Sequence, residues 1–137
     1  MFAAFFVAAS AAIILVLGLI HLTYTFYGPK LHPRDSALKA QLMVVSLNIS
    51  RETTMWRTWI GFNASHSFGC IFFGLVYGYL ALLQSTLLMR SWVLLAVGLA
   101  LLVGYFMIGR RYWFSVPFRG IALALALYST GLALNLR

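Results

Sequence analysis

The stretch Phe2–Tyr27, FAAFFVAASAAIILVLGLIHLTYTFY, contains no Asp, Glu, Lys or Arg. About 20 apolar residues in a helix are enough to cross the hydrocarbon core of a bilayer, so this run is long enough for one membrane span. Three further apolar runs follow along the chain, at residues 56–83, 92–108 and 118–136. The four runs occupy most of the 137 residues, and we therefore expect an integral membrane protein with little chain outside the membrane.

The composition favours one architecture for these runs. Hydrophobic residues make up 63% of the chain and charged residues 9%, and no remaining segment is long enough for a separate soluble domain. Backbone polar groups in lipid must pair internally, so only helices and closed barrels span it, and the runs lack the short alternating segments of barrel strands. The sequence predicts an all-α fold, a single domain over residues 1–137, formed by an integral membrane four-helix bundle whose consecutive helices are antiparallel neighbours.

The net charge of +8 indicates an orientation in the membrane. Eight of the ten basic residues fall in or beside the first and third connections between the runs, and the other two are Arg90 and Arg137. Basic residues concentrate on the cytoplasmic side of membrane proteins, so we expect these two connections to be cytoplasmic and both the N-terminus and the C-terminus to be extracytoplasmic. The expected partners are membrane lipids and other membrane proteins, and no nucleic acid, because no exposed basic domain is available to bind one.

The first connection is the only long one, and it begins GPKLHPRD at Gly28. Pro29 and Pro33 exclude a regular helix there, and Asp35 is a suitable N-cap for a helix that follows. Apolar residues then recur at helical spacing, at Leu38, Leu42, Val45 and Ile49. Because this segment is apolar but too short to span, we expect a short helix within residues 35–49 that lies in the cytoplasmic membrane interface. The alternative is a loop packed beneath the bundle.

The third connection contains a cluster of cations beside aromatic side chains at a predicted water boundary. Its members are Arg110, Arg111, Tyr112 and Trp113. Such residues commonly anchor a helix at the membrane interface, which is the simpler interpretation. The functional alternative is a site that binds a phosphate or a lipid headgroup.

The candidates for function are the polar side chains inside the spans, because such groups are costly in lipid. At about 100° per residue, one face of the second predicted helix carries Glu52, Trp59, Asn63, His66, Cys70 and Tyr77. His21 and Tyr24 belong to a similar polar stripe on the first run. We expect a polar intramembrane cluster formed by Tyr24, Asn63, His66 and Ser67.

His21 and His66 both fall in the cytoplasmic halves of their spans, so they can face each other. Two histidines from neighbouring helices are what a b-type haem needs as axial ligands, and a haem- or quinone-associated membrane redox protein that uses His21 and His66 is one hypothesis. The other is that neutral His66 hydrogen-bonds to Tyr24, Asn63 or a backbone carbonyl and holds the helices together, without a cofactor.

Catalysis and metal binding have little support in the sequence. Asp35 and Glu52 are the only acidic residues and Cys70 is the only cysteine, so we expect no catalytic residues and no metal site. Small residues, in contrast, recur every four positions and allow helices to approach closely in lipid. These repeats are Ala4-Ala8-Ala12, Gly61-Ser65-Gly69, Cys70-Gly74-Gly78 and Ala122-Ala126-Thr130. We therefore expect a small structural or accessory subunit that packs against a larger membrane protein complex or against copies of itself.

Three stretches of the chain resemble a small family of bacterial four-span integral membrane proteins with no established function. They are Gly18–Phe26 (GLIHLTYTF), Ser50–Gly69 (SRETTMWRTWIGFNASHSFG) and Arg111–Phe118 (RYWFSVPF). The resemblance extends over nearly the whole chain. It implies a four-span fold and a location in the bacterial inner membrane, and it implies no reaction.

Overall fold

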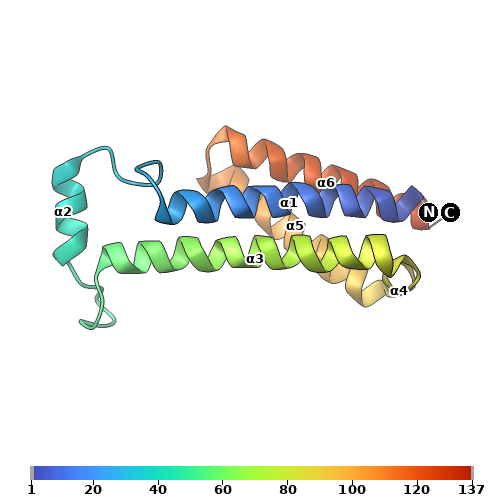
Figure 1. The fold of residues 1–137 in the computed structure, drawn as a ribbon, viewed down its shortest axis with the longest axis horizontal. Helices are drawn as coiled ribbons and strands as arrows, with labels where there is room; N and C mark the ends of the chain where they lie inside the picture. The colour runs from blue at the N-terminus through green and yellow to red at the C-terminus, as the bar shows by residue number, and fades with distance from the viewer. Residues whose placement is uncertain (1, 137) are drawn as a thin grey trace. The chain divides into compact units, whose positions relative to one another are not determined.

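The computed structural model describes residues 2–136, and within that range it is helical, with one isolated β-bridge and no strand (Figure 1). The helices are α1 (Phe2–Phe26), α2 (Ser36–Val44), α3 (Met55–Leu83), α4 (Ser85–Arg90), α5 (Trp92–Tyr112) and α6 (Ser115–Asn135). Four of them, α1, α3, α5 and α6, are long and apolar enough to cross a membrane. This confirms the predicted all-α fold with four potential membrane spans.

The long helices begin and end within four residues of the apolar runs in the sequence. The largest difference is at the end of α5, which continues past Ile108 to Tyr112 and includes Arg110 and Arg111 in its last turn. Cations interact favourably with the carbonyl end of a helix, so these arginines are compatible with the helix and do not end it. The second connection also contains a short helix, α4, that the sequence did not indicate.

The chain divides into two compact units. The core unit comprises residues 2–17 and 70–136, and the loop unit comprises residues 18–69. Helices α1 and α3 each contribute a segment to both units. The core unit therefore contains parts of all four long helices together with α4, whereas the loop unit contains the end of α1, all of α2 and the start of α3.

Within the core unit, glycines mark the places where α1 lies close to its neighbours. A Cβ added to Gly131 of α6 would lie 2.9 Å from the carbonyl oxygen of Ala3, and one added to Gly120 would lie 2.9 Å from the Leu17 side chain. Residue numbers rise along α1 as they fall along α6, so the two helices are antiparallel. Gly74 of α3 approaches α1 in the same way. Such close contacts between helices require small residues.

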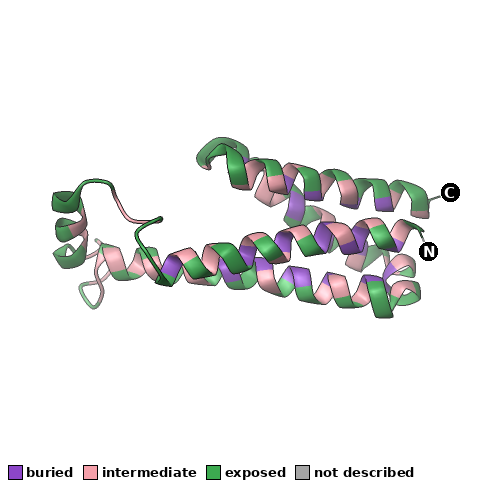
Figure 2. Ribbon diagram, turned by 45° about the horizontal axis from the view of Figure 1, so that its top comes forward, coloured by how far each residue is buried: buried purple, intermediate pink, exposed green. Residues whose placement is uncertain are grey.

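Two tyrosines connect α5 to its other neighbours. The Tyr77 hydroxyl, on α3, donates a hydrogen bond to the carbonyl oxygen of Leu94 (2.6 Å), and the Tyr128 hydroxyl, on α6, donates to the next carbonyl oxygen, that of Leu95 (3.0 Å). Both tyrosines are buried, with ring centroids 6.0 Å apart, and both lie directly against Gly98 of α5. Buried residues occupy one side of each long helix and exposed residues the other (Figure 2).

Asp35 caps α2, as predicted from the sequence. Its Oδ1 accepts hydrogen bonds from the backbone N–H groups of Ala37 (2.8 Å) and Leu38 (3.4 Å). No residue of α2 is buried, and α2 runs across the ends of the loop-unit segments of α1 and α3 and not alongside them (Figure 1). The segment is therefore a helix and not a packed loop.

Helix α2 is shorter than the segment predicted from the apolar spacing. It ends at Val44, and Val45 and Ile49 lie outside it. The chain then turns back, and Ser46 forms an isolated antiparallel bridge with Thr54 just before α3 begins. The reason lies in the residue types that follow, because β-branched, Ser and Asn residues favour extended and turn conformations over a helix.

Replacement of Gly98 by alanine should destabilise the core unit. The new Cβ would lie 2.6 Å from the Tyr77 ring and would also collide with the Tyr128 hydroxyl. We expect a loss of about 1–3 kcal/mol, the usual cost of overpacking, seen as a lower midpoint of thermal unfolding for the protein in detergent. Gly104→Ala is the control on the same helix, because nothing lies within 4 Å of its added Cβ. Equal midpoints for the two variants would contradict the packing described above.

Candidate functional site

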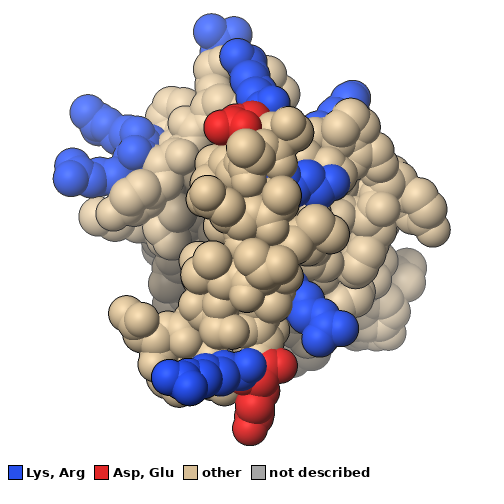
Figure 3. All heavy atoms as spheres, turned by 90° about the vertical axis from the view of Figure 1, so that its left-hand side faces the viewer, with Lys and Arg blue, Asp and Glu red and all other residues tan. Residues whose placement is uncertain are grey.

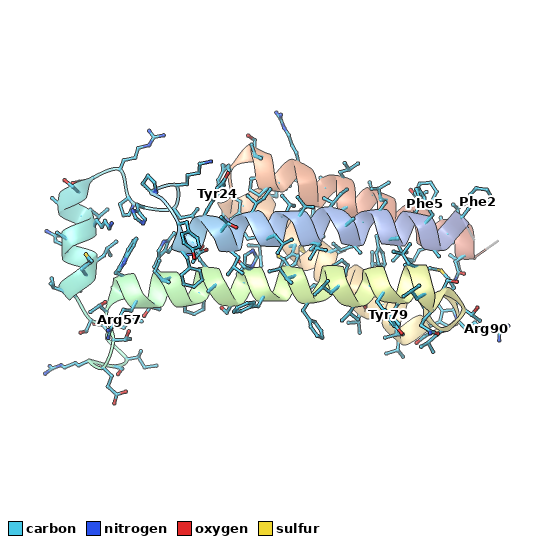
Figure 4. The ribbon with its side chains drawn as sticks, viewed as in Figure 1. Phe2, Phe5, Tyr24, Arg57, Tyr79 and Arg90 are labelled. Atoms are coloured by element: carbon cyan, nitrogen blue, oxygen red, sulfur yellow. The ribbon has the colours of Figure 1, made fainter. Side chains whose placement is uncertain are left out.

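The residues singled out in the spans lie mainly in the loop unit, where the last turns of α1 pack beside the first turns of α3 (Figure 4). His21 is five residues before the end of α1, and His66 is eleven residues after the start of α3. The three- and four-residue spacing of Asn63, His66 and Ser67 places them on one side of α3. Glu52 does not share that side as predicted, because it lies in the loop and α3 begins only at Met55.

Asn63 joins α3 to α1. Its Nδ2 donates a hydrogen bond to the carbonyl oxygen of Trp59 (2.8 Å), one turn earlier on α3, and its Oδ1 lies 2.9 Å from Nε2 of His21. An amide oxygen only accepts, so the hydrogen-bond pattern assigns the proton of His21 to Nε2, which donates. The Asn63 side chain therefore uses its amide oxygen and one of its two N–H donors within the protein.

The structure also brings the two histidines together. The ring centroids of His21 and His66 are 5.5 Å apart, and the ring planes are nearly perpendicular, at 87°. Ser67 is buried beside them, but its hydroxyl donates to the carbonyl oxygen of Asn63 on the same helix (2.9 Å). The side-chain oxygen of Asn63 thus pairs with His21.

Tyr24 has a different partner from the rest of the predicted polar cluster. Its hydroxyl accepts a hydrogen bond from Nζ of Lys30 (2.7 Å), and this ammonium also lies 4.0 Å from the centroid of the Tyr24 ring. Lys30 belongs to the loop that follows α1, and its side chain reaches back to Tyr24 on the helix. Tyr24 is labelled in Figure 4. The structure therefore groups Asn63, His66 and Ser67 with His21 and directs Tyr24 to the loop.

The bond between His21 and Asn63 bears on the haem hypothesis. Histidine binds haem iron through the lone pair of a ring nitrogen, whereas Nε2 of His21 directs its proton at Asn63. Binding through Nε2 would require Asn63 to release His21. The rings of His21 and His66, which now meet edge to face, would also have to separate for a planar macrocycle to lie between them. The arrangement is the one expected of polar residues that hold two helices together in lipid.

The predicted interfacial cluster lies in the core unit, at the end of α5. Arg110, Arg111 and Tyr112 are exposed in the last turn of the helix. Trp113 follows it and is half-buried, with its ring 3.5 Å from the position of a Cβ on Gly109. The carbonyl end of α5 gives the arginines a structural role whether or not they bind a headgroup.

A second cluster, which the sequence analysis missed, forms where the first connection packs on the start of α3. The indole Nε1 of Trp59 donates to the carbonyl oxygen of Leu31 (3.2 Å), and the ring of His32 lies edge-on to that of Trp56, 5.0 Å between centroids. Lys39 reaches the same place from α2, with Nζ 3.2 Å from Nδ1 of His32. The available signal was the pair of tryptophans at the start of a span, since tryptophan favours the membrane–water boundary.

The link between His21 and Asn63 should be measurable in a double-mutant cycle with His21→Phe and Asn63→Leu. Each single variant leaves one polar partner unpaired, whereas the double variant removes both, so we expect a coupling of about 0.6–1.7 kcal/mol in thermal or denaturant unfolding. Ser65→Ala is the control, because the Ser65 hydroxyl donates to the carbonyl oxygen of Phe62 on its own helix (3.0 Å). Strictly additive effects of the two substitutions would mean that the bond does not hold the helices together.

Comparisons with known proteins give no relative from which a function can be transferred. No family model, curated protein or solved structure matches the chain. The resemblance to bacterial four-span membrane proteins therefore stays a prediction. What the protein does has to be argued from the residues that it buries and from those that it leaves exposed.

Proposed function

We propose that this is a multi-pass protein of the bacterial inner membrane that serves as a small accessory subunit. It packs against a larger membrane protein complex or against copies of itself, and it has no catalysis of its own. The observation that carries the proposal is a row of small, exposed residues on α3, which we term the α3 stripe: Gly61, Ser65 and Gly69.

The α3 stripe is an exposed part of the loop unit. All three of its residues are exposed, and a Cβ added to Gly61 would meet nothing within 4 Å. The neighbouring Phe62 and Phe68 are also exposed, by 71% and 60%. Lipid tails pack readily against large side chains, whereas a row of small residues lets the backbone of another helix come close. The α3 stripe is therefore suited to contact with protein.

The other repeats of small residues indicate what such rows do when a partner is present. Ala4 and Ala8 of α1 and Gly74 of α3 are buried, and Gly74 is in close contact with α1. Ala126 and Thr130 of α6 are exposed, like the α3 stripe. The chain thus uses two of its repeats in its own packing and presents the other two outward, which supports assembly with further helices.

The distribution of charge supports the proposed orientation. Basic residues gather in or beside the first connection and near the turn between α5 and α6: Lys30, Arg34, Lys39, Arg51, Arg57, Arg110, Arg111 and Arg119. The positive-inside rule makes both regions cytoplasmic and both termini extracytoplasmic. Helix α2 suits the cytoplasmic interface, because none of its residues is buried and its apolar side chains Met43 and Val44 are exposed.

The histidine pair is consistent with a structural role. Nε2 of His21 donates to Asn63, and Asn63 and Ser67 each donate to a carbonyl oxygen of α3. Polar groups satisfied in this way connect helices in lipid and require no ligand. No particular contact favours a redox role over the structural role, so we propose only the accessory subunit.

A bulky residue in the α3 stripe should abolish assembly. We expect Gly61→Leu to leave the fold intact, since Gly61 is exposed and nothing lies within 4 Å of the added Cβ, and to prevent another helix from approaching. We expect at least a tenfold loss of the co-purifying partner, or of the homo-oligomer, when the tagged protein is extracted in a gentle detergent and examined by mass spectrometry and size-exclusion chromatography. A loss of about 1.4 kcal/mol in the free energy of association is enough to weaken binding tenfold.

Gly104→Leu is the matched control, because a Cβ at Gly104 of α5 also meets nothing within 4 Å. This variant should assemble like the wild type. If both variants assemble normally, the α3 stripe is not an interface. If both fail equally, the effect is one of bulk in a membrane helix and not of position, and the proposal fails in that case too.

The orientation can be tested with single cysteines at exposed positions on the two sides. A membrane-impermeant maleimide should label Thr86→Cys in intact spheroplasts, whereas Ser36→Cys should react only after lysis. The native Cys70 is buried in α3 and gives the background. Labelling of Ser36→Cys in intact spheroplasts would reverse the orientation proposed here.

A further inference from the structure

Lys39 of α2 is held in a defined position in the loop unit. Its Nζ lies 3.2 Å from Nδ1 of His32 and 5.2 Å from the ring centroid of Trp56. An ammonium group only donates, so Nδ1 of His32 is the acceptor and uses one of the three N–H groups of Lys39. The Trp56 ring adds a cation–π contact. These two contacts position the charge and leave donors for an anion.

No carboxylate neutralises Lys39 among residues 2–136, where its one hydrogen-bond partner is His32. Asp35, one turn earlier, uses its Oδ1 to cap α2. The loop unit as a whole carries five basic residues against two acidic ones, and in the view onto α2 Lys and Arg outnumber Asp and Glu (Figure 3). The charge balance around Lys39 therefore favours a negatively charged ligand.

The surroundings of Lys39 are apolar as well as basic. Leu38, Met43 and Val44 of α2 are exposed by 45%, 52% and 76%. Trp59, one turn after Trp56 on α3, is 46% exposed. Cations, tryptophans and exposed aliphatic side chains together match the boundary between lipid headgroups and acyl chains. A soluble phosphate would leave these apolar side chains in water, whereas a lipid would cover them.

We propose that Lys39, positioned by His32 and Trp56, binds the phosphate of an anionic phospholipid. The apolar side chains of α2 then lie against the acyl chains, and Trp56 lies among the headgroups. This inference rests on the membrane location proposed above, but it does not depend on the role as an accessory subunit.

The test is native mass spectrometry of the full-length protein, extracted in detergent and titrated with phosphatidylglycerol or with phosphatidylethanolamine. One basic side chain at an anionic surface changes affinity about fivefold, so we expect the wild type to prefer phosphatidylglycerol by about that factor. Lys39→Gln should lose the preference, and Lys39→Arg should keep it. Lys30→Gln is the control: it removes the same charge from the same unit, but at a side chain that bonds to Tyr24.

Three results would overturn the site. Equal loss of the preference in Lys39→Gln and Lys30→Gln would mean that the charge acts diffusely. If the preference for phosphatidylglycerol is lost only when Arg110 and Arg111 are both replaced by Gln, the lipid binds at the end of α5. Displacement of the lipid by excess inorganic phosphate would identify a phosphate site. Gly61→Leu should keep the preference, so a failure of the accessory role would leave this measurement unchanged.

Discussion

The core unit depends on the hydrogen bonds that two tyrosines make to α5. Tyr77 and Tyr128 come from different helices, yet they donate to adjacent carbonyl oxygens, those of Leu94 and Leu95, and both rings lie against Gly98. In lipid a buried hydroxyl has no water to bond with, and these two hydroxyls find their partners in backbone carbonyls inside the protein. This need positions α3 and α6 against α5, and α1 completes the arrangement where it meets the glycines of α3 and α6.

The same need for hydrogen-bond partners inside the protein explains the contacts among the polar side chains of the loop unit. His21 and Asn63 meet because the Nε2–H group of His21 and the amide oxygen of Asn63 can pair in a region where water is scarce. For the same reason, the Ser67 hydroxyl donates to a carbonyl oxygen of its own helix. Polar groups in membrane helices are often catalytic or ligand-binding. Here His21, Asn63 and Ser67 make hydrogen bonds within the protein. The features that suggest outside partners are the exposed α3 stripe and the charge of Lys39, which no carboxylate neutralises among residues 2–136.

Hydropathy predicted the four long helices well, because an apolar stretch of about 20 residues has no stable alternative to a helix in lipid. It placed the end of α5 too early, since Arg110 and Arg111 resemble a loop in sequence but suit the carbonyl end of a helix. The site was harder to predict. Helical spacing put Asn63 and His66 on one side of α3, but it does not encode which of them reaches His21, nor that Lys30 folds back onto Tyr24.

The outward-facing residues decide the function proposed here, and the direct measurement is photocrosslinking in native membranes. A photoreactive amino acid replaces the exposed Phe62, beside the α3 stripe, or, as a control, the exposed Met107 of α5. We predict a discrete protein adduct from position 62 and only lipid adducts from position 107. Lipid adducts alone from both positions would contradict the claim that the α3 stripe faces another protein.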